Sequence, residues 1–247
     1  IHTPFCTHKC SYCDFYSIVD HQDRQAAYLD RLIDELTLLT PHAAGLPLQT
    51  IFIGGGTPSL LRLGLWMRLL AALHSLFDLS GPDLEFTVEC NPETSTPGLM
   101  EILAAGGVNR ISLGAQSFNR IHLKTLERLH NPDNVPRALE AARAAGIPRQ
   151  SIDLIYAIPG QTLEEWSSDL DIALSLRLSH LSCYCLTYEP ATGMTALRDA
   201  GRIIQAPEAL EAEMFEMTHR RLAAEGLPWY EVSNFAAPGH EPRHNLA

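Results

Sequence analysis

Short runs of β-branched and other apolar residues alternate along the chain with longer segments in which apolar residues recur every three or four positions. The short runs predict strands and the longer segments predict amphipathic helices. The predicted strands cover residues 1–3, 50–53, 84–89, 110–113, 151–156 and 180–187. Strands joined by helical crossovers form a parallel sheet that the helices cover. The pattern therefore predicts an α/β fold in which six βα units form a partial (β/α)6 barrel.

Three signals locate individual helices more closely. Thr57 precedes a proline, which predicts a helix that the threonine hydroxyl caps and that continues over residues 60–77. Gly146 and Gly226 follow helical segments and predict left-handed helix ends, where a residue without Cβ is favoured. Apolar residues at helical spacing predict one buried stripe, formed by Leu163, Trp166, Leu170 and Leu174.

Composition excludes several classes of function. The net charge is −11 and only Lys9 and Lys124 are lysines, so the chain has no basic stripe for nucleic acid and no GxxxxGK phosphate loop. We find no run of eighteen apolar residues and no signal peptide pattern, which predicts that no segment spans a membrane. Six cysteines in 247 residues are few, which favours a reducing compartment, and we expect a cytoplasmic protein.

Three of the cysteines form a compact CxxxCxxC array close to the first residue: Cys6, Cys10 and Cys13. Clusters of the 4Fe-4S type are usually held by four cysteines, so an array of three either uses a distant fourth or leaves one iron open to a small ligand. Phe15, not a cysteine, follows Cys13-Asp14. Three kinds of site compete at this point: a zinc site, a closed electron-transfer cluster and an open cluster. Zinc is disfavoured because no second cysteine or histidine pair has suitable spacing.

Other polar residues follow predicted strands, where barrels of this type form their sites. A GGGTP sequence at residues 54–58 lets the backbone approach a ligand closely, although a tight turn is the better explanation for three glycines taken alone. Glu89 ends one predicted strand, Gln116 follows another, and Asp153 lies within an apolar strand where its charge needs a partner. Together these residues predict a polar site at one end of the barrel.

Cys183 and Cys185 share one face of the last predicted strand with Thr187, because strand side chains alternate with a period of two. Buried free cysteine packs as a small hydrophobic residue. We therefore expect both cysteines in the core and not at the metal site.

With these motifs in place, the chain resembles the radical S-adenosylmethionine (SAM) superfamily. The resemblance implies a 4Fe-4S cluster on Cys6, Cys10 and Cys13, with SAM on the fourth iron. Within the superfamily, the sequences IHTPFC (1–6), IGGGTPS (53–59), ECNP (89–92), SLGAQSF (112–118) and IDLIY (152–156) are similar to the oxygen-independent coproporphyrinogen III oxidase group. This resemblance covers nearly the whole chain.

Two branches of that group differ in recognisable ways. The oxidase branch usually carries a further cysteine where this chain has Phe15. The segment YEVSNFA (230–236) and the pair His244-Asn245 resemble the other branch, the HemW heme chaperones, which bind heme and pass it to acceptor proteins. In that branch the pair continues into Tyr-Trp, whereas here the motif is cut after Ala247. We expect residues 1–190 to form the barrel and residues 191–247 to lead into a C-terminal domain not included in this chain.

The resemblance also implies roles for individual residues. It places Gly55, Gly56 and Thr57 at the methionine end of SAM and Glu89 at its amino or ribose region. The remaining contacts to SAM would come from Gln116, Arg128, Asp153 and, more weakly, Thr187. An imidazole such as His244 can bind heme iron, and ordering of its own loop is an equally good explanation.

Three functions therefore stay open at this stage. The first is a heme chaperone with heme as bound cargo, a heme-acceptor protein as partner and a flavodoxin or ferredoxin as external reductant. The second is an enzyme, a coproporphyrinogen III oxidase that decarboxylates a porphyrinogen. The third is a closed 4Fe-4S protein that only transfers electrons and does not bind SAM.

Overall fold

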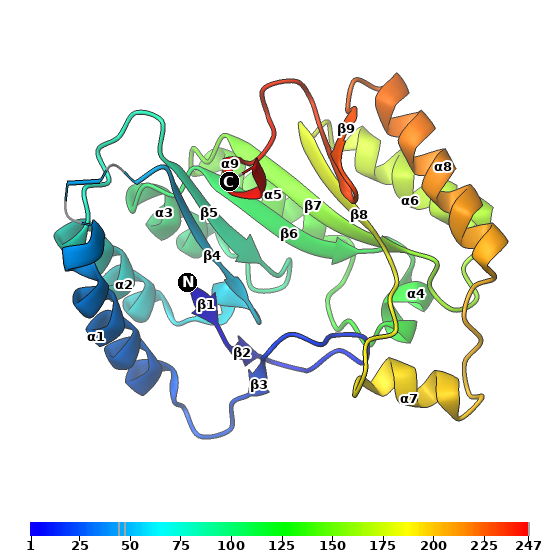
Figure 1. The fold of residues 1–247 in the computed structure, drawn as a ribbon, viewed down its shortest axis with the longest axis horizontal. Helices are drawn as coiled ribbons and strands as arrows, with labels where there is room; N and C mark the ends of the chain where they lie inside the picture. Colours follow the sequence, from blue (N-terminus) through cyan, green and yellow to red (C-terminus); the bar gives the residue numbers. More distant parts are fainter. Residues whose placement is uncertain (44, 47, 247) are drawn as a thin grey trace.

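Six parallel strands in sequence order form most of an eight-stranded sheet (Figure 1). The computed structural model describes residues 1–43, 45, 46 and 48–246. The strand order is β1 (His2–Thr3), β4 (Thr50–Gly55), β5 (Glu85–Cys90), β6 (Arg110–Gln116), β7 (Arg149–Tyr156), β8 (His180–Cys185), β10 (Asn234–Ala236) and β9 (Trp229–Glu231). The six predicted strands are thereby confirmed, as is the α/β class. Because consecutive parallel strands lie side by side and crossovers of this kind are right-handed, the connecting helices lie on one face of the sheet, as in a partial barrel.

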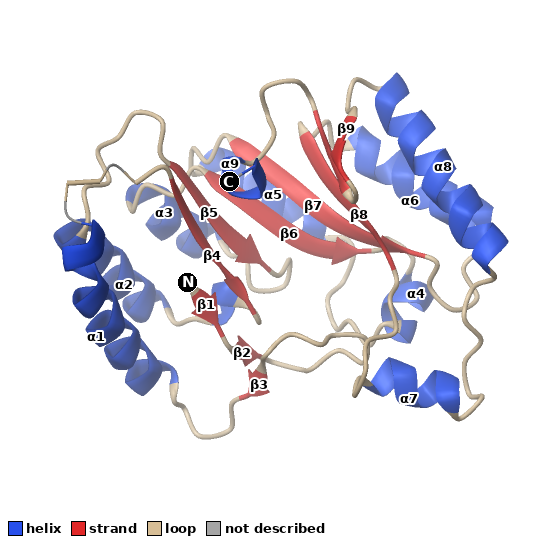
Figure 2. Cartoon of the chain, in the orientation of Figure 1, coloured by secondary structure: helices blue, strands red, loops and turns tan. Residues whose placement is uncertain are grey.

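The longer helices lie along one face of this sheet, as the colouring by secondary structure shows (Figure 2). They are α1 (Gln25–Ala43), α2 (Leu63–Leu76), α3 (Pro97–Ala105), α5 (Asn134–Ala144), α6 (Leu163–Ser175) and α8 (Glu208–Ala224). Shorter elements are β2 (Phe5–Cys6), β3 (Ile18–Val19), the 3-10 turn η1 (Pro58–Leu60), α4 (Arg120–Thr125), α7 (Gly193–Asp199) and α9 (Arg243–Leu246). None of the helices among the described residues is both long and apolar enough to cross a membrane.

The main core lies between the sheet and these helices. Trp66 from α2, Phe86 from β5 and Trp166 from α6 are all fully buried in it. The predicted stripe on α6 is confirmed, since Trp166 and Leu170 have no exposed surface and the Trp166 indole donates to Thr218 Oγ1 over 2.9 Å. The opposite face of the strands carries polar residues, because Glu85, Thr87 and Glu89 alternate with core residues along β5.

The helix-end predictions had mixed outcomes. Gly146 (φ 88°) and Gly226 (φ 78°) adopt the left-handed conformation that was expected of them. The prediction for Thr57 was wrong: it precedes η1, its side chain caps nothing, and α2 begins only at Leu63. The physical reason is that the Thr57 hydroxyl is used elsewhere, against Cys6, as the site below shows.

The last part of the chain adds to the same sheet. β10 pairs antiparallel with β8, and β9 pairs antiparallel with β10. After β10 the chain returns across the sheet to α9, which contacts β4 (Figure 1). Residues 229–246, which we call the C-terminal segment, thus connect the two sides of the open barrel.

Candidate functional site

The three cysteines of the CxxxCxxC array lie on a loop that is fixed at both ends. Cys6 ends β2, which pairs in parallel with β3, so that Cys6 lies opposite Val19. Inside the loop, Cys13 N donates to Cys10 O over 3.1 Å in a tight turn. All three thiols are free and partly exposed. The loop crosses below the carboxyl ends of the strands toward α4 and α7 (Figure 1), where Met194 N donates to Ser11 O over 2.7 Å.

Two side chains from the strand-end loops point at these sulfurs. Thr57 Oγ1 donates to Cys6 Sγ over 3.6 Å, and Arg128 Nη1 donates to Cys10 Sγ over 3.8 Å. Such donors stabilise thiolates and cluster sulfurs, and they set the electronic properties of a bound cluster. Arg128 is anchored by a second hydrogen bond from Nη2 to Gly114 O over 2.7 Å, while its Nε has no partner among the described residues.

The glycine sequence after β4 approaches the cysteine loop as closely as a backbone can. A Cβ on Gly56 would lie 2.8 Å from Phe5 O and 3.0 Å from Cys6 Sγ. Gly55 has φ 110°, and its N–H donates to Glu89 Oε2 over 2.9 Å. Both positions require glycine, the first because of the close approach and the second because of its backbone angle. The loop therefore links Cys6 to Glu89.

Two partly buried carboxyl groups lie near this loop: Glu89, which contacts Gly55, and Asp153, whose charge acts on Glu89. Burial, followed by repulsion from Asp153, raises the pKa of Glu89 to about 7, although the Gly55 N–H opposes the shift. Burial likewise raises the pKa of Asp153 to about 6, against hydrogen bonds that include one from Ser112 Oγ over 3.0 Å. Each carboxyl lies close to its protonation point near neutral pH, so a bound ammonium group or hydroxyl would stabilise the charged form.

Gln116 and Arg128 lie together over Gly114. A Cβ at position 114 would be 2.7 Å from Gln116 Nε2 and 2.9 Å from Arg128 Nη2. Gln116 has φ 64°, an uncommon angle for a residue with a side chain. Tyr12, which is not among the predicted site residues, lies next to Arg128 and Asp153, and its pKa is raised mainly by burial. Its place between Cys10 and Cys13 was the only sequence signal for it.

The remaining predicted residues lie elsewhere. Thr187 is exposed beyond the end of β8 and has no hydrogen bond to the other site residues in the part of the chain that the structure describes. Cys183 is buried in the main core and Cys185 packs against it, as predicted. His244 lies on α9 and stacks on Phe52 of β4, with ring centroids 4.5 Å apart.

The donor set suits an iron-sulfur cluster. Across residues 1–43, 45, 46 and 48–246, no three His, Cys, Asp or Glu side chains are grouped to hold a single metal ion. A cuboidal cluster does not need such a group, because each thiolate binds its own iron atom. A cavity of about 690 Å³ borders Cys10 and Cys13, lined on its other side by residues of α7. None of the residues predicted to bind SAM lines this cavity, so it is not the site formed by Glu89 and the glycine loop.

A family model described as "Radical SAM superfamily" matches residues 1–173. The chain belongs to the radical SAM superfamily, whose members use a 4Fe-4S cluster and SAM. Among solved structures, it is similar to coproporphyrinogen III oxidase (HemN) from Escherichia coli, described as a radical SAM enzyme, with TM-score 0.87, 28% identity, and coverage of 97% of this chain and 55% of that chain.

Two curated relatives have a higher sequence identity to this chain than the oxidase has. The chain is 38% identical over 246 residues to the heme chaperone HemW of Bacillus subtilis. The aligned region covers 100% of this chain and 65% of that protein. It is 39% identical over 251 residues to the heme chaperone HemW of Escherichia coli, with 100% and 64% coverage. The chain thus spans less than two thirds of the length of these relatives.

Proposed function

We propose that this chain is the radical SAM part of a heme chaperone of the HemW type. The main support is the identity of 38% and 39% to such chaperones, which covers the full length of this chain. Residues 1–190 would form the barrel with the cofactor site, and residues 191–247, which add β10 and β9 to the same sheet, would lead into a C-terminal domain. A cytoplasmic location follows from the same proposal.

In this proposal Cys6, Cys10 and Cys13 each bind one iron of a 4Fe-4S cluster. The hydrogen bonds that Thr57 and Arg128 direct at Cys6 and Cys10 support this assignment, because they compensate negative charge on the sulfurs. When bound, the reduced cluster supplies the electron that cleaves SAM in this superfamily. The electron would come from an external flavodoxin or ferredoxin.

The residues around Glu89 would hold SAM. Gly55, Gly56 and Thr57 offer a backbone surface with no side chain larger than threonine for its methionine end. Glu89 can accept from its amino group or ribose, with a pKa that allows the charged form near neutral pH. Gln116, Arg128 and Asp153 would contact the carboxylate and ribose, and Thr187 is the weakest candidate because it is exposed beyond the strand.

His244 would bind the heme iron. Its ring nitrogens have no hydrogen-bond partner among the described residues, and the ring is exposed apart from its stack on Phe52. A neutral imidazole with a free nitrogen is a common axial ligand of heme. The bound heme would then pass to an acceptor protein.

A heme titration of the purified full-length protein tests the proposal. We expect saturable binding with an absorption spectrum typical of histidine ligation. His244→Ala should weaken binding and lose the spectral features of histidine ligation. His240→Ala is the matched control, because His240 is also exposed and lies in the same segment. No saturable binding by the wild type would refute the proposal.

The second candidate function is coproporphyrinogen III oxidation, which the TM-score of 0.87 to that oxidase favours. Phe15 stands where that branch usually has a cysteine, and it is 57% exposed. Reduced protein incubated with SAM and coproporphyrinogen III separates the two functions. Release of carbon dioxide without heme binding would favour the oxidase.

A further inference from the structure

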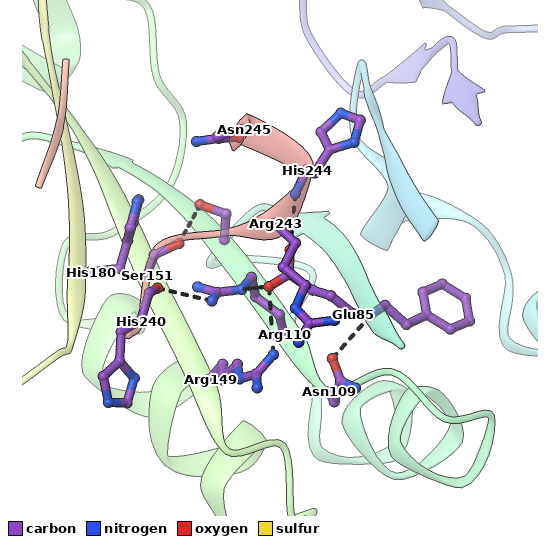
Figure 3. Close-up of polar contacts among 12 residues, drawn as sticks. Glu85, Asn109, Arg110, Arg149, Ser151, His180, His240, Arg243, His244 and Asn245 are labelled. Atoms are coloured by element: carbon purple, nitrogen blue, oxygen red, sulfur yellow. Dashed lines mark hydrogen bonds and ion pairs between the residues drawn. The ribbon is translucent and has the colours of Figure 1, made fainter. Parts of the chain in front are cut away.

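A buried ion pair lies at the amino ends of β5 and β6 (Figure 3). Glu85 is 0% exposed and Arg110 is 2% exposed. Arg110 Nε donates to Glu85 Oε2 over 3.1 Å, and the half-exposed Arg149 approaches the same oxygen at 3.5 Å. These residues lie at the other end of β5 and β6 from Glu89 and Gln116, so the cofactor site does not account for them.

Both members of the pair also hold the C-terminal segment. Arg110 Nη2 donates to His240 O over 3.0 Å, and His244 N donates to Glu85 Oε1 over 3.4 Å. These contacts join residues 130 and 159 positions apart in the sequence. The backbone on both sides of residues 241–243 is therefore fixed to one buried pair (Figure 3).

A second anchor fixes the residue after His244. Asn245 Nδ2 donates to the Tyr230 hydroxyl over 2.9 Å, and that hydroxyl shares a hydrogen bond of 2.9 Å with His180 Nε2. Burial, and then the charge of Arg110, lowers the pKa of His180 to about 3, so its ring is neutral. His244 is thus held from both sides. Arg110 fixes the backbone that precedes it, at His240, and Tyr230 fixes the side chain of Asn245, which follows it.

The result is a defined place for the His244 ring. The ring lies parallel to Phe52, with an angle of 17° between the planes. Phe52 in turn lies beside Gly54, where a Cβ would be 2.7 Å from Phe52 Cε1 and 2.6 Å from Glu89 Oε2. His244 is therefore separated from the Glu89 end of the barrel by one aromatic ring.

Stability alone is a weak explanation for the pair. Replacing a buried ion pair by apolar residues of similar volume is often neutral or stabilising, whereas its best-attested benefit is a single defined arrangement. Here each partner uses a hydrogen bond on the same distant segment. We propose that Glu85 and Arg110 are positioning residues that hold His244 for iron ligation, an inference that rests on the proposed heme function.

The test compares heme binding by four forms of the full-length protein. The double variant Glu85→Leu/Arg110→Met removes both anchors and leaves no buried charge of the pair unpaired. His244→Ala removes the ligand itself. Arg149→Gln is the matched control, because Arg149 contacts Glu85 but not the C-terminal segment. Heme affinity, the absorption and electron paramagnetic resonance spectra of ferric heme, and the melting temperature are measured for each.

We expect the double variant to melt at a temperature close to that of the wild type. It should bind heme about 10- to 100-fold more weakly, as is usual when a residue that orients a metal ligand is lost. Its heme spectra should match those of His244→Ala. Arg149→Gln should keep the wild-type spectra. If the double variant fails to fold, Arg110→Lys replaces it in the comparison. Lysine keeps the charge but lacks the forked group that reaches both Glu85 and His240. Arg110→Lys should therefore show the same altered heme spectra.

The outcomes separate the two proposals. Wild-type spectra in the folded double variant or in Arg110→Lys, with altered spectra in His244→Ala, would overturn the positioning role and leave the heme function intact. Unchanged spectra in His244→Ala would overturn the ligand role of His244 and with it the positioning role, but not the heme function. No heme binding by the wild type would overturn the heme function as well.

Discussion

Gly56→Ala tests the close contact between the glycine loop and the cysteine loop. An added Cβ would lie 2.8 Å from Phe5 O, 3.0 Å from Pro4 C and 3.0 Å from Cys6 Sγ. Two of these atoms belong to the backbone, so no side-chain rotation relieves the clash. Restoring an ordinary contact of 3.4 Å requires a backbone displacement of about 0.6 Å, and overpacking of this kind costs about 1–3 kcal/mol.

The displacement should move Cys6 as well as destabilise the chain. We expect Gly56→Ala to lower the free energy of unfolding by about 1–3 kcal/mol in urea titrations of the metal-free protein. It should also lower the iron bound per chain after anaerobic reconstitution, because Cys6 Sγ is one of the atoms displaced.

Gly64→Ala provides the matched control. Gly64 is exposed in the first turn of α2, and a Cβ there meets no atom within 4 Å. Alanine should raise the free energy of unfolding by about 0.5–1 kcal/mol, since glycine is unfavourable in helices. Equal stabilities and equal iron contents in the two variants would refute the close-contact argument.

Three further predictions concern stability. Because the pKa of folded Glu89 is raised to about 7, the folded state holds a proton that the unfolded state has lost, so stability falls as pH rises from about 4.5 through 7. Glu89→Gln should remove this fall in urea titrations of the metal-free protein. A constant difference in stability between this variant and the wild type from pH 5 to 8 would contradict the prediction. Trp166→Ala should lower the free energy of unfolding by about 3–5 kcal/mol, because the side chain is fully buried and its indole is hydrogen-bonded. Trp229, which is exposed, provides the control, and an equal or greater decrease in Trp229→Ala would contradict the prediction. Thr162→Ala should cost about 1 kcal/mol by breaking the capping box with Glu165, which thermal melting can measure against Thr125→Ala.

The central strands were predictable because their signal is local. A few consecutive apolar residues mark each strand, and all six appear within a few residues of their predicted bounds. β2 and β3 were missed because each has only two residues and forms through pairing across the cysteine loop. β9 and β10 were missed for the same reason, since three-residue strands carry too little periodicity.

The site was predictable only in part. Spacing predicts Cys6, Cys10 and Cys13 as cluster ligands. The Thr57-Pro58 pair wrongly predicted a helix cap, because a local signal cannot show that Cys6 competes for the Thr57 hydroxyl. Glu85 and Arg110 gave no signal at all. Charged residues in a sequence look the same whether solvated or buried, and contacts across 130 or more positions are set by the fold.

In the proposed site, three cysteines hold the cluster and leave one iron for SAM. The sharpest test of this arrangement is electron paramagnetic resonance of the reduced, reconstituted protein with and without SAM. We expect SAM to change the spectrum of a 4Fe-4S cluster in the wild type and in Cys183→Ala, whose thiol lies in the core, and we expect Cys13→Ala to lose the cluster. A cluster spectrum that SAM leaves unchanged, or bound zinc in place of iron, would contradict the account.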